Sequence, residues 1–221
     1  KMQVGRTGII TPVAIFHPVT IGGVTICKAS LFNAKELKRL SLRRGDHVIV
    51  KRAGDVIPLI VGKANLREEN EHLPIFEMPP LCPECGGKIE GPSKGVLMKC
   101  SAGWKCKGQA LERMVHFSSK GAMGMKGLSR AGLKDLIDNS IVKGYSGLYK
   151  LKENIIGEEI EALPGWGKKK AKNVLDSIED SRNVSLERFI YAIGIPEVGI
   201  GTARSISGIY EGNYGELWSD V

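Results

Sequence analysis

Hydrophobic and polar positions alternate with a period of two along most of residues 4–64, the pattern of half-buried β-strands. The alternation predicts strands over residues 4–16, 18–32, 47–53 and 56–64. Within the second of these, Gly22 and Gly23 predict a hairpin turn. A spacing of three to four residues between hydrophobic positions predicts one helix over residues 33–40. Pro58 cannot donate to a sheet ladder, so we expect it at an edge or a bulge.

Five or so strands with one helix predict a small Greek-key β-barrel, and the OB-fold is a common nucleic-acid-binding example of such a barrel. Residues 66–80 are polar and then punctuated by proline, which predicts a linker. From about residue 109 the hydrophobic spacing becomes helical. A turn with glycine precedes a helix three times there, at residues 126–137, 164–175 and 198–206, which indicates a stacked helical array. The fold class is therefore multidomain α+β.

Four cysteines are clustered between the two halves of the chain. Cys82, Cys85, Cys100 and Cys106 follow the spacing C-x2-C, fourteen residues, then C-x5-C. Zn²⁺ favours four thiolates in a closed tetrahedron, and this leaves no position for water, so the predicted zinc ion is structural. The alternatives are unlinked buried cysteines or a redox C-x-x-C pair. The fifth cysteine, Cys27, lies alone in a predicted strand, and we expect a small core residue there.

The charge of the chain indicates an anionic partner. Lys and Arg number 32 against 24 Asp and Glu, which gives a net charge of +8. Such an excess is typical of proteins that bind nucleic acid or an anionic membrane surface. No apolar run approaches the roughly 18 residues that a membrane span needs, and no apolar signal region begins the chain, so we expect a cytoplasmic protein without a membrane partner.

The glycine turns of the helical half suggest how a polyanion is held. Gly165 and Gly167 flank Trp166 just before a predicted helix, where backbone N–H groups can approach a phosphate without an intervening Cβ. Lys168 and Lys169 add positive charge beside the turn. Further copies occur at Gly199 with Gly201 and, with serine in place of the second glycine, at Gly127 with Ser129. The alternative for any single copy is a glycine that merely ends a helix.

These features resemble one family closely, the bacterial NAD-dependent DNA ligases. The resemblance is carried, in order, by QVGRTGIITPVA, KASLFNAKEL, GDHVIVKRAGDVIP, the four cysteines and the glycine turns, which resemble helix-hairpin-helix motifs. It covers almost the whole chain. It implies an OB-fold domain at residues 1–77, a four-cysteine zinc finger at residues 78–110 and a truncated helix-hairpin-helix domain at residues 111–221.

The resemblance also implies DNA contacts by barrel residues near a nick. These residues are Arg6, Thr7, Arg52, Val56 and Ile57. Without the family resemblance, there is an alternative for each: the two arginines can be plain surface charges, and the two apolar residues can be plain strand core. The implied partner is nicked double-stranded DNA, and the implied role is to clamp it while a phosphodiester bond forms during replication and repair.

The family further implies an adenylation domain before Lys1 and a BRCT domain after Val221, so we expect a piece of a longer enzyme. That piece lacks a K-x-D-G motif and is expected to be inactive alone and monomeric. NAD and Mg²⁺ would serve the parent enzyme, mainly outside this segment. Two alternatives stay open: a stand-alone DNA-repair binding module, and a nuclease subunit, which needs more acidic residues than Asp135 and Asp138, themselves expected on a solvated helix face.

Overall fold

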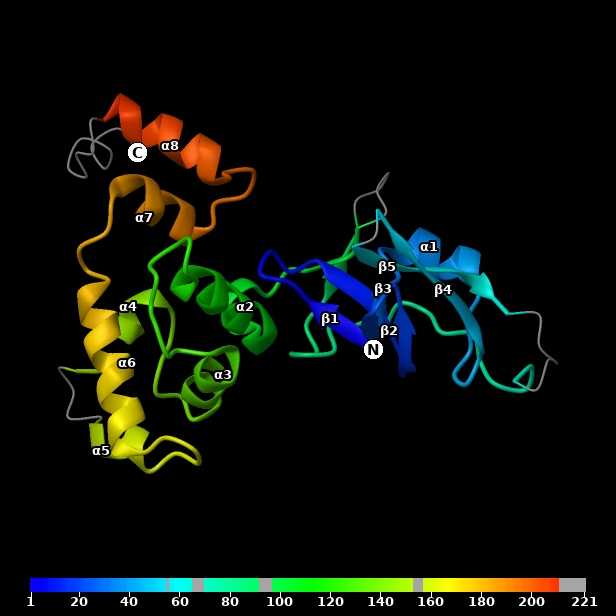
Figure 1. Cartoon of the computed structure of the whole chain (residues 1–221), viewed down its shortest axis with the longest axis horizontal. Helices are drawn as coiled ribbons and strands as arrows, with labels where there is room; N and C mark the ends of the chain where they lie inside the picture. The colour runs from blue at the N-terminus through cyan, green and yellow to red at the C-terminus, as the bar shows by residue number, and fades with distance from the viewer. Residues whose placement is uncertain (55, 65–69, 92–96, 153–156, 211–221) are drawn as a thin grey trace. The chain divides into compact units, whose positions relative to one another are not determined.

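The chain forms two compact units, Lys1–Gly108 and Gln109–Val221. The computed structural model (Figure 1) describes residues 1–54, 56–64, 70–91, 97–152 and 157–210. Each unit has a hydrophobic core of its own. The finer division into three domains, at residues 1–77, 78–110 and 111–221, stays a prediction.

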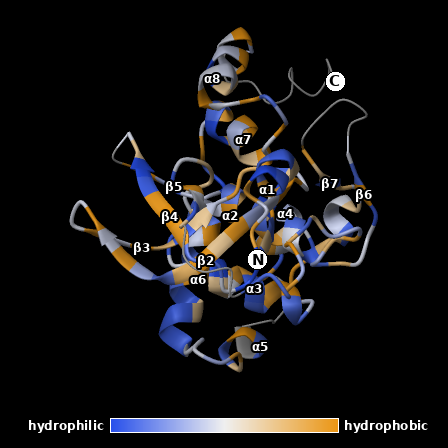
Figure 2. Ribbon diagram, turned by 90° about the vertical axis from the view of Figure 1, so that its right-hand side faces the viewer, coloured by the Kyte–Doolittle hydropathy of each residue, from blue (hydrophilic) through white to orange (hydrophobic). Residues whose placement is uncertain are grey.

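A five-stranded barrel sheet dominates the first unit. Its strands are β1 (Met2–Val4), β2 (Ile10–Ile21), β3 (Val24–Ser30), β4 (Val48–Ala53) and β5 (Ile57–Lys63). They lie in the order β1-β2-β3-β5-β4, antiparallel except for β3 and β5, which pair in parallel through Ser30 and Leu59. Figure 2 shows hydrophobic residues along β2, β3 and β4 with hydrophilic residues between them. The predicted OB-fold is confirmed, and with it the α+β class.

The first two strands divide at places other than those predicted. Strand β2 continues through Pro18, where the sequence pattern breaks, because a register shift between Ile15 and Val19 absorbs the irregularity. The chain turns before β2, between β1 and Ile10, and again at Gly22 and Gly23. That second turn confirms the predicted hairpin: Ile21 pairs with Val24, and both glycines have the positive φ of a type I′ turn.

Two local predictions for the barrel are wrong. Pro58 lies in β5, which is an inner strand between β3 and β4, and the bulge of that strand falls at Val61 instead. The proline is tolerated because it is the second residue of the strand and the pairing with β3 begins one residue later. Cys27 is exposed, because Ile26 and Ala29 are the residues of β3 that are buried.

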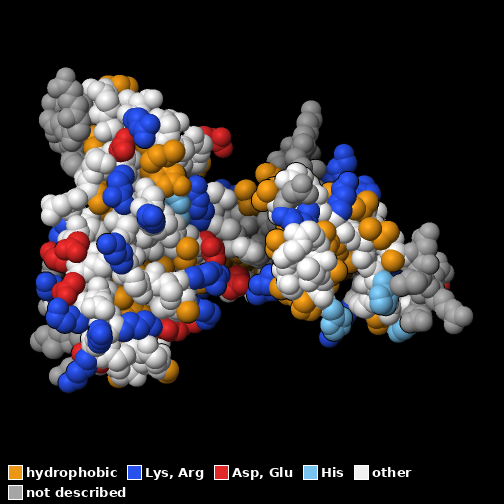
Figure 3. Space-filling view, in the orientation of Figure 1, with side chains coloured by type: hydrophobic (Ala, Val, Ile, Leu, Met, Phe, Trp, Pro, Cys, Tyr) orange, Lys and Arg blue, Asp and Glu red, His pale blue; other side chains and the backbone are white. Residues whose placement is uncertain are grey.

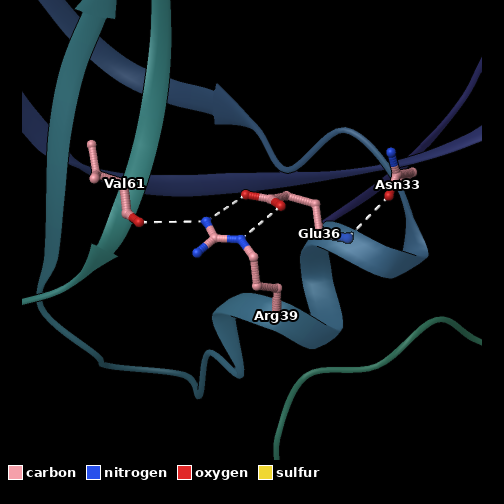
Figure 4. Close-up of polar contacts among 4 residues, drawn as sticks. All are labelled: Asn33, Glu36, Arg39 and Val61. Atoms are coloured by element: carbon pink, nitrogen blue, oxygen red, sulfur yellow. Dashed lines mark hydrogen bonds and ion pairs between the residues drawn. The ribbon is translucent and has the colours of Figure 1, made fainter.

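The predicted helix is α1 (Ala34–Leu40), and its ends explain its limits. The Asn33 side chain accepts a hydrogen bond from the Glu36 N–H at 3.0 Å, which satisfies one free donor of the first turn. Arg39 makes a two-pronged contact with the Glu36 carboxylate and donates to the carbonyl of Val61 on β5 at 3.5 Å (Figure 4). Leu37 and Leu40 bury the other face in the barrel core.

The segment predicted as a linker follows the barrel over part of its length. The Phe76 N–H donates to the carbonyl of Leu42 at 2.8 Å, and the Arg43 side chain donates to the carbonyl of Leu73 at 2.8 Å. Residues 66–69 of this segment lie outside the described residues. The described remainder is therefore attached to the barrel instead of hanging free.

The second unit is helical, as predicted. Its helices are α2 (Lys107–Ser118), α3 (Arg130–Asp138), α4 (Tyr145–Tyr149), α5 (Gly157–Glu161), α6 (Lys168–Asp180), α7 (Leu186–Ile193) and α8 (Ile200–Ile209). Residues of α2, α3, α4, α5 and α6 form one hydrophobic core. Helices α7 and α8 share a smaller cluster around Leu186, Ile190 and Ala203. Among the described helices of both units, none is long and apolar enough to cross a bilayer.

Candidate metal centre and nucleic-acid interface

Two short turns bring the four cysteines together. In the first, the Gly86 N–H donates to the carbonyl of Cys82 at 2.8 Å, and the Cys82 N–H donates to the carbonyl of Gly87 at 2.9 Å. The strands β6 (Ile89–Glu90) and β7 (Lys99–Cys100) form a small ribbon, and the 3₁₀ turn η1 (Gly103–Lys105) leads to Cys106. Cys82, Cys100 and Cys106 are buried, whereas Cys85 is exposed.

The sulfur atoms have the spacing that a tetrahedral zinc site requires. The Sγ atoms of Cys82 and Cys106 lie 3.9 Å apart, those of Cys85 and Cys100 lie 3.7 Å apart, and all four lie within 4.8 Å of one another. Zn–S bonds of about 2.3 Å in a tetrahedron place sulfurs about 3.8 Å apart. None of the five cysteines, all of which are described, forms a disulfide. The set therefore fits Zn²⁺ with four protein ligands.

The thiols show why a cation belongs in this cluster. Burial raises the pKa of Cys82. Cys85 is exposed as a residue, but desolvation of its sulfur and hydrogen bonding with the other three sulfurs raise its pKa to about 12. Burial acts in the same direction on Cys100, but the Ala102 N–H and the neighbouring thiols hydrogen-bond to its sulfur and leave its pKa below the ordinary value. Without metal the four sulfurs cannot all be thiolates, because they would repel one another. A divalent cation replaces the protons and removes that repulsion.

The predicted barrel residues lie at two turns. Arg6 and Thr7 are the central residues of the turn between β1 and β2, which the Gly8 N–H closes on the carbonyl of Gly5 at 2.9 Å. The Arg52 guanidinium donates at 3.3 Å to the carbonyls of Ile21 and Gly22 in the β2–β3 hairpin. Arg52 therefore supports a neighbouring turn in this structure in addition to carrying surface charge.

Val56 and Ile57 are apolar residues on the surface. Their exposed fractions are 75% and 56%, so the interpretation of these two residues as strand core is wrong. They follow the turn at Gly54, and the Val56 N–H donates to the carbonyl of Ala53 at 3.1 Å. The two exposed apolar side chains lie at the turn between β4, which carries Arg52, and β5.

The turn at Gly165 and Gly167 leaves the start of α6 open. Gly165 has a φ of +78°, Gly167 is the N-cap residue, and a Cβ at either would meet no described atom within 4 Å. Trp166 between them is buried, with 1% of its surface exposed. Lys168 and Lys169, the first two residues of α6, are exposed. Figure 3 shows Lys and Arg side chains gathered at the end of α6 nearest α5. Free N–H groups and positive charge thus lie together.

Trp166 ties this turn to α3. Its indole N–H donates to the Asp135 carboxylate at 3.2 Å, and a Cβ on Gly132 of α3 would come within 2.9 Å of the indole ring. The Lys170 Nζ lies 4.4 Å from the centroid of the Trp166 ring and donates to the carbonyl of Gly165 at 3.0 Å. The interpretation of Asp135 as part of a solvated helix face is therefore wrong, because its carboxylate accepts a hydrogen bond from a buried indole. The partner lies 31 residues away, so the local sequence gives no sign of this contact.

The turn before α8 resembles the turn before α6, but its residues correspond differently from what the glycine spacing predicts. Its N-cap residue is Gly199, which corresponds to Gly167, and the residue with positive φ is Glu197 (+64°), which corresponds to Gly165. Gly201 is the second residue of α8 and contributes one of its first N–H groups. A Cβ at Gly199 or Gly201 would meet nothing within 4 Å among the described atoms. The shared signal is the pattern proline, any residue, hydrophobic residue, glycine.

The degenerate turn at Gly127 faces protein. A Cβ on Gly127 would lie 3.3 Å from the Val174 side chain of α6, and the Lys126 N–H donates to the Ser177 hydroxyl at 2.6 Å. The N-cap residue is Ser129, whose hydroxyl accepts the Gly132 N–H at 3.2 Å. The free groups of this turn are used within the second unit.

One supporting residue of the helical unit was missed in the sequence. Arg188 of α7 donates to the carbonyl of Ala122 at 2.8 Å and to the carbonyl of Lys120 at 3.0 Å. It thereby fixes the loop between α2 and the turn at Gly127. An arginine whose partners are backbone carbonyls 66 and 68 residues away leaves no local pattern.

An OB-fold barrel, a tetracysteine site that fits Zn²⁺ and helices that begin at repeated glycine turns define a class of modular protein. The barrel of this class is of a type that binds nucleic acid in other proteins. Residues 1–72 match the OB-fold domain of NAD-dependent DNA ligases. Residues 1–72 belong to that family, and the chain as a whole is homologous to a segment of NAD-dependent DNA ligases.

The homology extends beyond the barrel. The DNA ligase of Rickettsia bellii (strain RML369-C) is 40% identical over 215 residues, which are 95% of this chain and 31% of that enzyme. The DNA ligases of Wolbachia pipientis subsp. Culex pipiens and of Cellvibrio japonicus are each 40% identical, over 95% and 94% of this chain and 32% and 30% of their own lengths. The chain thus spans about 30% of the length of the curated relatives that it matches.

Proposed function

We propose that this chain is the DNA-gripping part of an NAD-dependent DNA ligase and that it clamps a nicked duplex while the strand is sealed. The observation that carries the proposal is the pair of open helix starts at Gly167 and Gly199. Each presents unobstructed N–H groups, and lysines follow the first. Such a start binds a phosphate oxygen irrespective of base sequence.

The barrel supplies the second contact of the clamp. The turn with Arg6 and Thr7 and the exposed pair Val56 and Ile57 are chemically suited to a sugar-phosphate backbone and to a groove wall, respectively. Their combination on one barrel supports the placement of a distorted duplex there. Holding the duplex at fixed points would bring the ends of the nick into reaction geometry, and such positioning is a large part of catalysis by proximity.

Zinc takes a structural role in this proposal. Four protein ligands fill the coordination of the ion, so it neither binds water nor activates a nucleophile. Lys99, Lys105 and Lys107 are exposed around the ligands and offset part of the double negative charge of a zinc–tetrathiolate centre. The ion would supply folding free energy to a segment with little core of its own.

Salt-dependent binding tests the proposal. A labelled nicked duplex and an intact duplex are titrated by fluorescence anisotropy between about 50 and 200 mM salt, where a purely electrostatic contact weakens steeply. Replacement of Lys168 and Lys169 by glutamine should lower the slope of log affinity against log salt by about 2, at roughly 0.9 per phosphate contact. The matched control is Lys134→Gln, because the Lys134 side chain forms an ion pair with Asp138. This variant should leave the slope unchanged. An unchanged slope in the double variant would contradict the proposal.

We further propose that NAD and Mg²⁺ serve the adenylation part of the parent enzyme. The sequence of this chain contains no K-x-D-G motif. Incubation with NAD labelled in its adenylate group and Mg²⁺ should therefore leave the chain unlabelled, as judged by mass spectrometry of the intact protein. A stable AMP adduct would show that a nucleophilic lysine lies within these residues.

A further inference from the structure

The turn that carries Arg6 and Thr7 is bonded directly to the metal centre. The Cys100 N–H donates to the carbonyl of Gly8 at 2.9 Å, and the Ile10 N–H donates to the carbonyl of Met98 at 2.8 Å. Ile9 and Lys99 form an antiparallel bridge between these two bonds. The turn of the barrel is thus the third strand-like segment beside the β6–β7 ribbon.

The side chains continue this connection. Ile10, with 1% of its surface exposed, lies in one hydrophobic cluster with Cys82, Cys100 and Cys106. Val4, at the other end of the turn, belongs to the same cluster. Three of the four ligands and both ends of the turn therefore share one core.

We propose that the zinc centre and the β1–β2 turn are one thermodynamically coupled element, in which bound metal orders the turn and DNA bound at the turn tightens the hold on the metal. Gly8 and Ile10 are positioning residues in this scheme, because they act through Cys100 and Met98. The proposal rests on the proposed DNA contact of Arg6 and Thr7 only for its second half. Linkage requires that each ligand change the affinity of the other by the same factor.

A pair of glycine variants separates coupling from general destabilisation. Gly8 has a φ of +88° and lies beside the centre, whereas Gly23 has a φ of +75° in the β2–β3 hairpin. Alanine in this region of φ and ψ costs about 1–2 kcal/mol, a factor of roughly 5 to 30 in an equilibrium. Gly8→Ala should accelerate zinc release by about that factor, and Gly23→Ala should change it by less than about twofold.

Zinc release from the full chain is followed with excess of a colorimetric chelator, after circular dichroism has shown that each variant is folded. Equal release rates for Gly8→Ala and Gly23→Ala would overturn the proposal. Hydrogen exchange of the unsubstituted chain decides the question if Gly8→Ala does not fold. Removal of zinc should then expose the amides of residues 5–11 to exchange more than those of residues 20–25, and equal changes would overturn the coupling.

The DNA arm distinguishes this proposal from the proposed function. A saturating nicked duplex should slow zinc release from the unsubstituted chain, and the slowing should be smaller for Gly8→Ala than for Gly23→Ala. If the role of Gly8 were purely structural, the ratio of the zinc-release rates without and with DNA would be the same in the two variants. If the chain does not bind the duplex at all, the proposed function fails, while the comparison of release rates without DNA still tests the coupling between metal and turn.

Discussion

Replacement of Gly167 by serine should stabilise the fold and weaken DNA binding. Gly167 has φ −80° and ψ 165°, and Ser129, at the corresponding position before α3, has φ −76° and ψ 165°. A serine at residue 167 therefore adopts its conformation without strain, and its hydroxyl reaches the Lys170 N–H as Ser129 reaches the Gly132 N–H. The new side chain fills the space where a phosphate would approach.

The two effects have different sizes. Serine is a better N-cap than glycine by only a few tenths of a kcal/mol, which raises the Tm by about 1 °C for a chain of this length. Loss of one hydrogen bond to a charged phosphate removes about 1.5–3 kcal/mol, a factor of roughly 10 to 150 in affinity. Binding should therefore fall markedly although the protein is slightly more stable.

Thermal denaturation and anisotropy titration with duplex DNA at one fixed salt concentration measure both quantities. The reverse change Ser129→Gly is the matched control, because Gly127 of its turn packs against α6 and the Ser129 hydroxyl already accepts the Gly132 N–H: it should lower the Tm slightly and leave DNA affinity unchanged. An affinity of Gly167→Ser equal to that of the unsubstituted chain would refute the phosphate role of this helix start.

Three further results are expected. Glu197→Gly relieves a positive φ that costs about 1 kcal/mol and removes a negative charge beside α8, so Tm and DNA affinity should both rise; weaker binding would contradict this. The Arg43 N–H and Lys63 outweigh the effect of burial and lower the pKa of Asp46 below 3.8, so this carboxylate stabilises the fold above pH 3.8 and less as the pH falls further. Denaturant titrations should find Asp46→Asn about 1–3 kcal/mol less stable at pH 7 and the difference shrinking in acid; a constant difference would count against it. Metal analysis should give one zinc per chain, and a chelator should reduce the order of residues 81–91 and 97–106; a chain without metal would disprove the site.

Features set by neighbouring residues were predictable. Gly22 with Gly23 predicted the hairpin, and Asn33 marked the start of α1, because each of these depends on contacts within a few residues. The four cysteines come together over a longer stretch, but their paired spacing is a pattern that one shared metal ion explains, so the cluster was predictable as well. The cysteine pairs also limited the metal, since the ligand type and number were visible in the sequence. The barrel followed from strand alternation and a single intervening helix.

Features set by distant partners were not predictable. The continuity of β2 through Pro18 depends on a bulge against β3, and the role of Asp135 depends on an indole brought to it by another turn. The register of the turn before α8 was misread because Gly199 and Gly201 repeat the spacing of Gly165 and Gly167. Backbone conformation, not glycine spacing, shows which residues correspond.

Under the proposed function, the three turns differ in how the first N–H groups of their helices are used. At Gly167 and Gly199 the cap is a bare glycine with open space around it, and a phosphate could approach there. In the copy at Gly127 the turn packs against Val174 of α6, and the Lys126 N–H donates to the Ser177 hydroxyl. Ser129 caps α3 itself by accepting the Gly132 N–H. Under the proposed function, the loss of the second glycine in that copy costs no DNA contact. That turn instead packs against α6, the helix that begins at Lys168 and follows the open turn at Gly167.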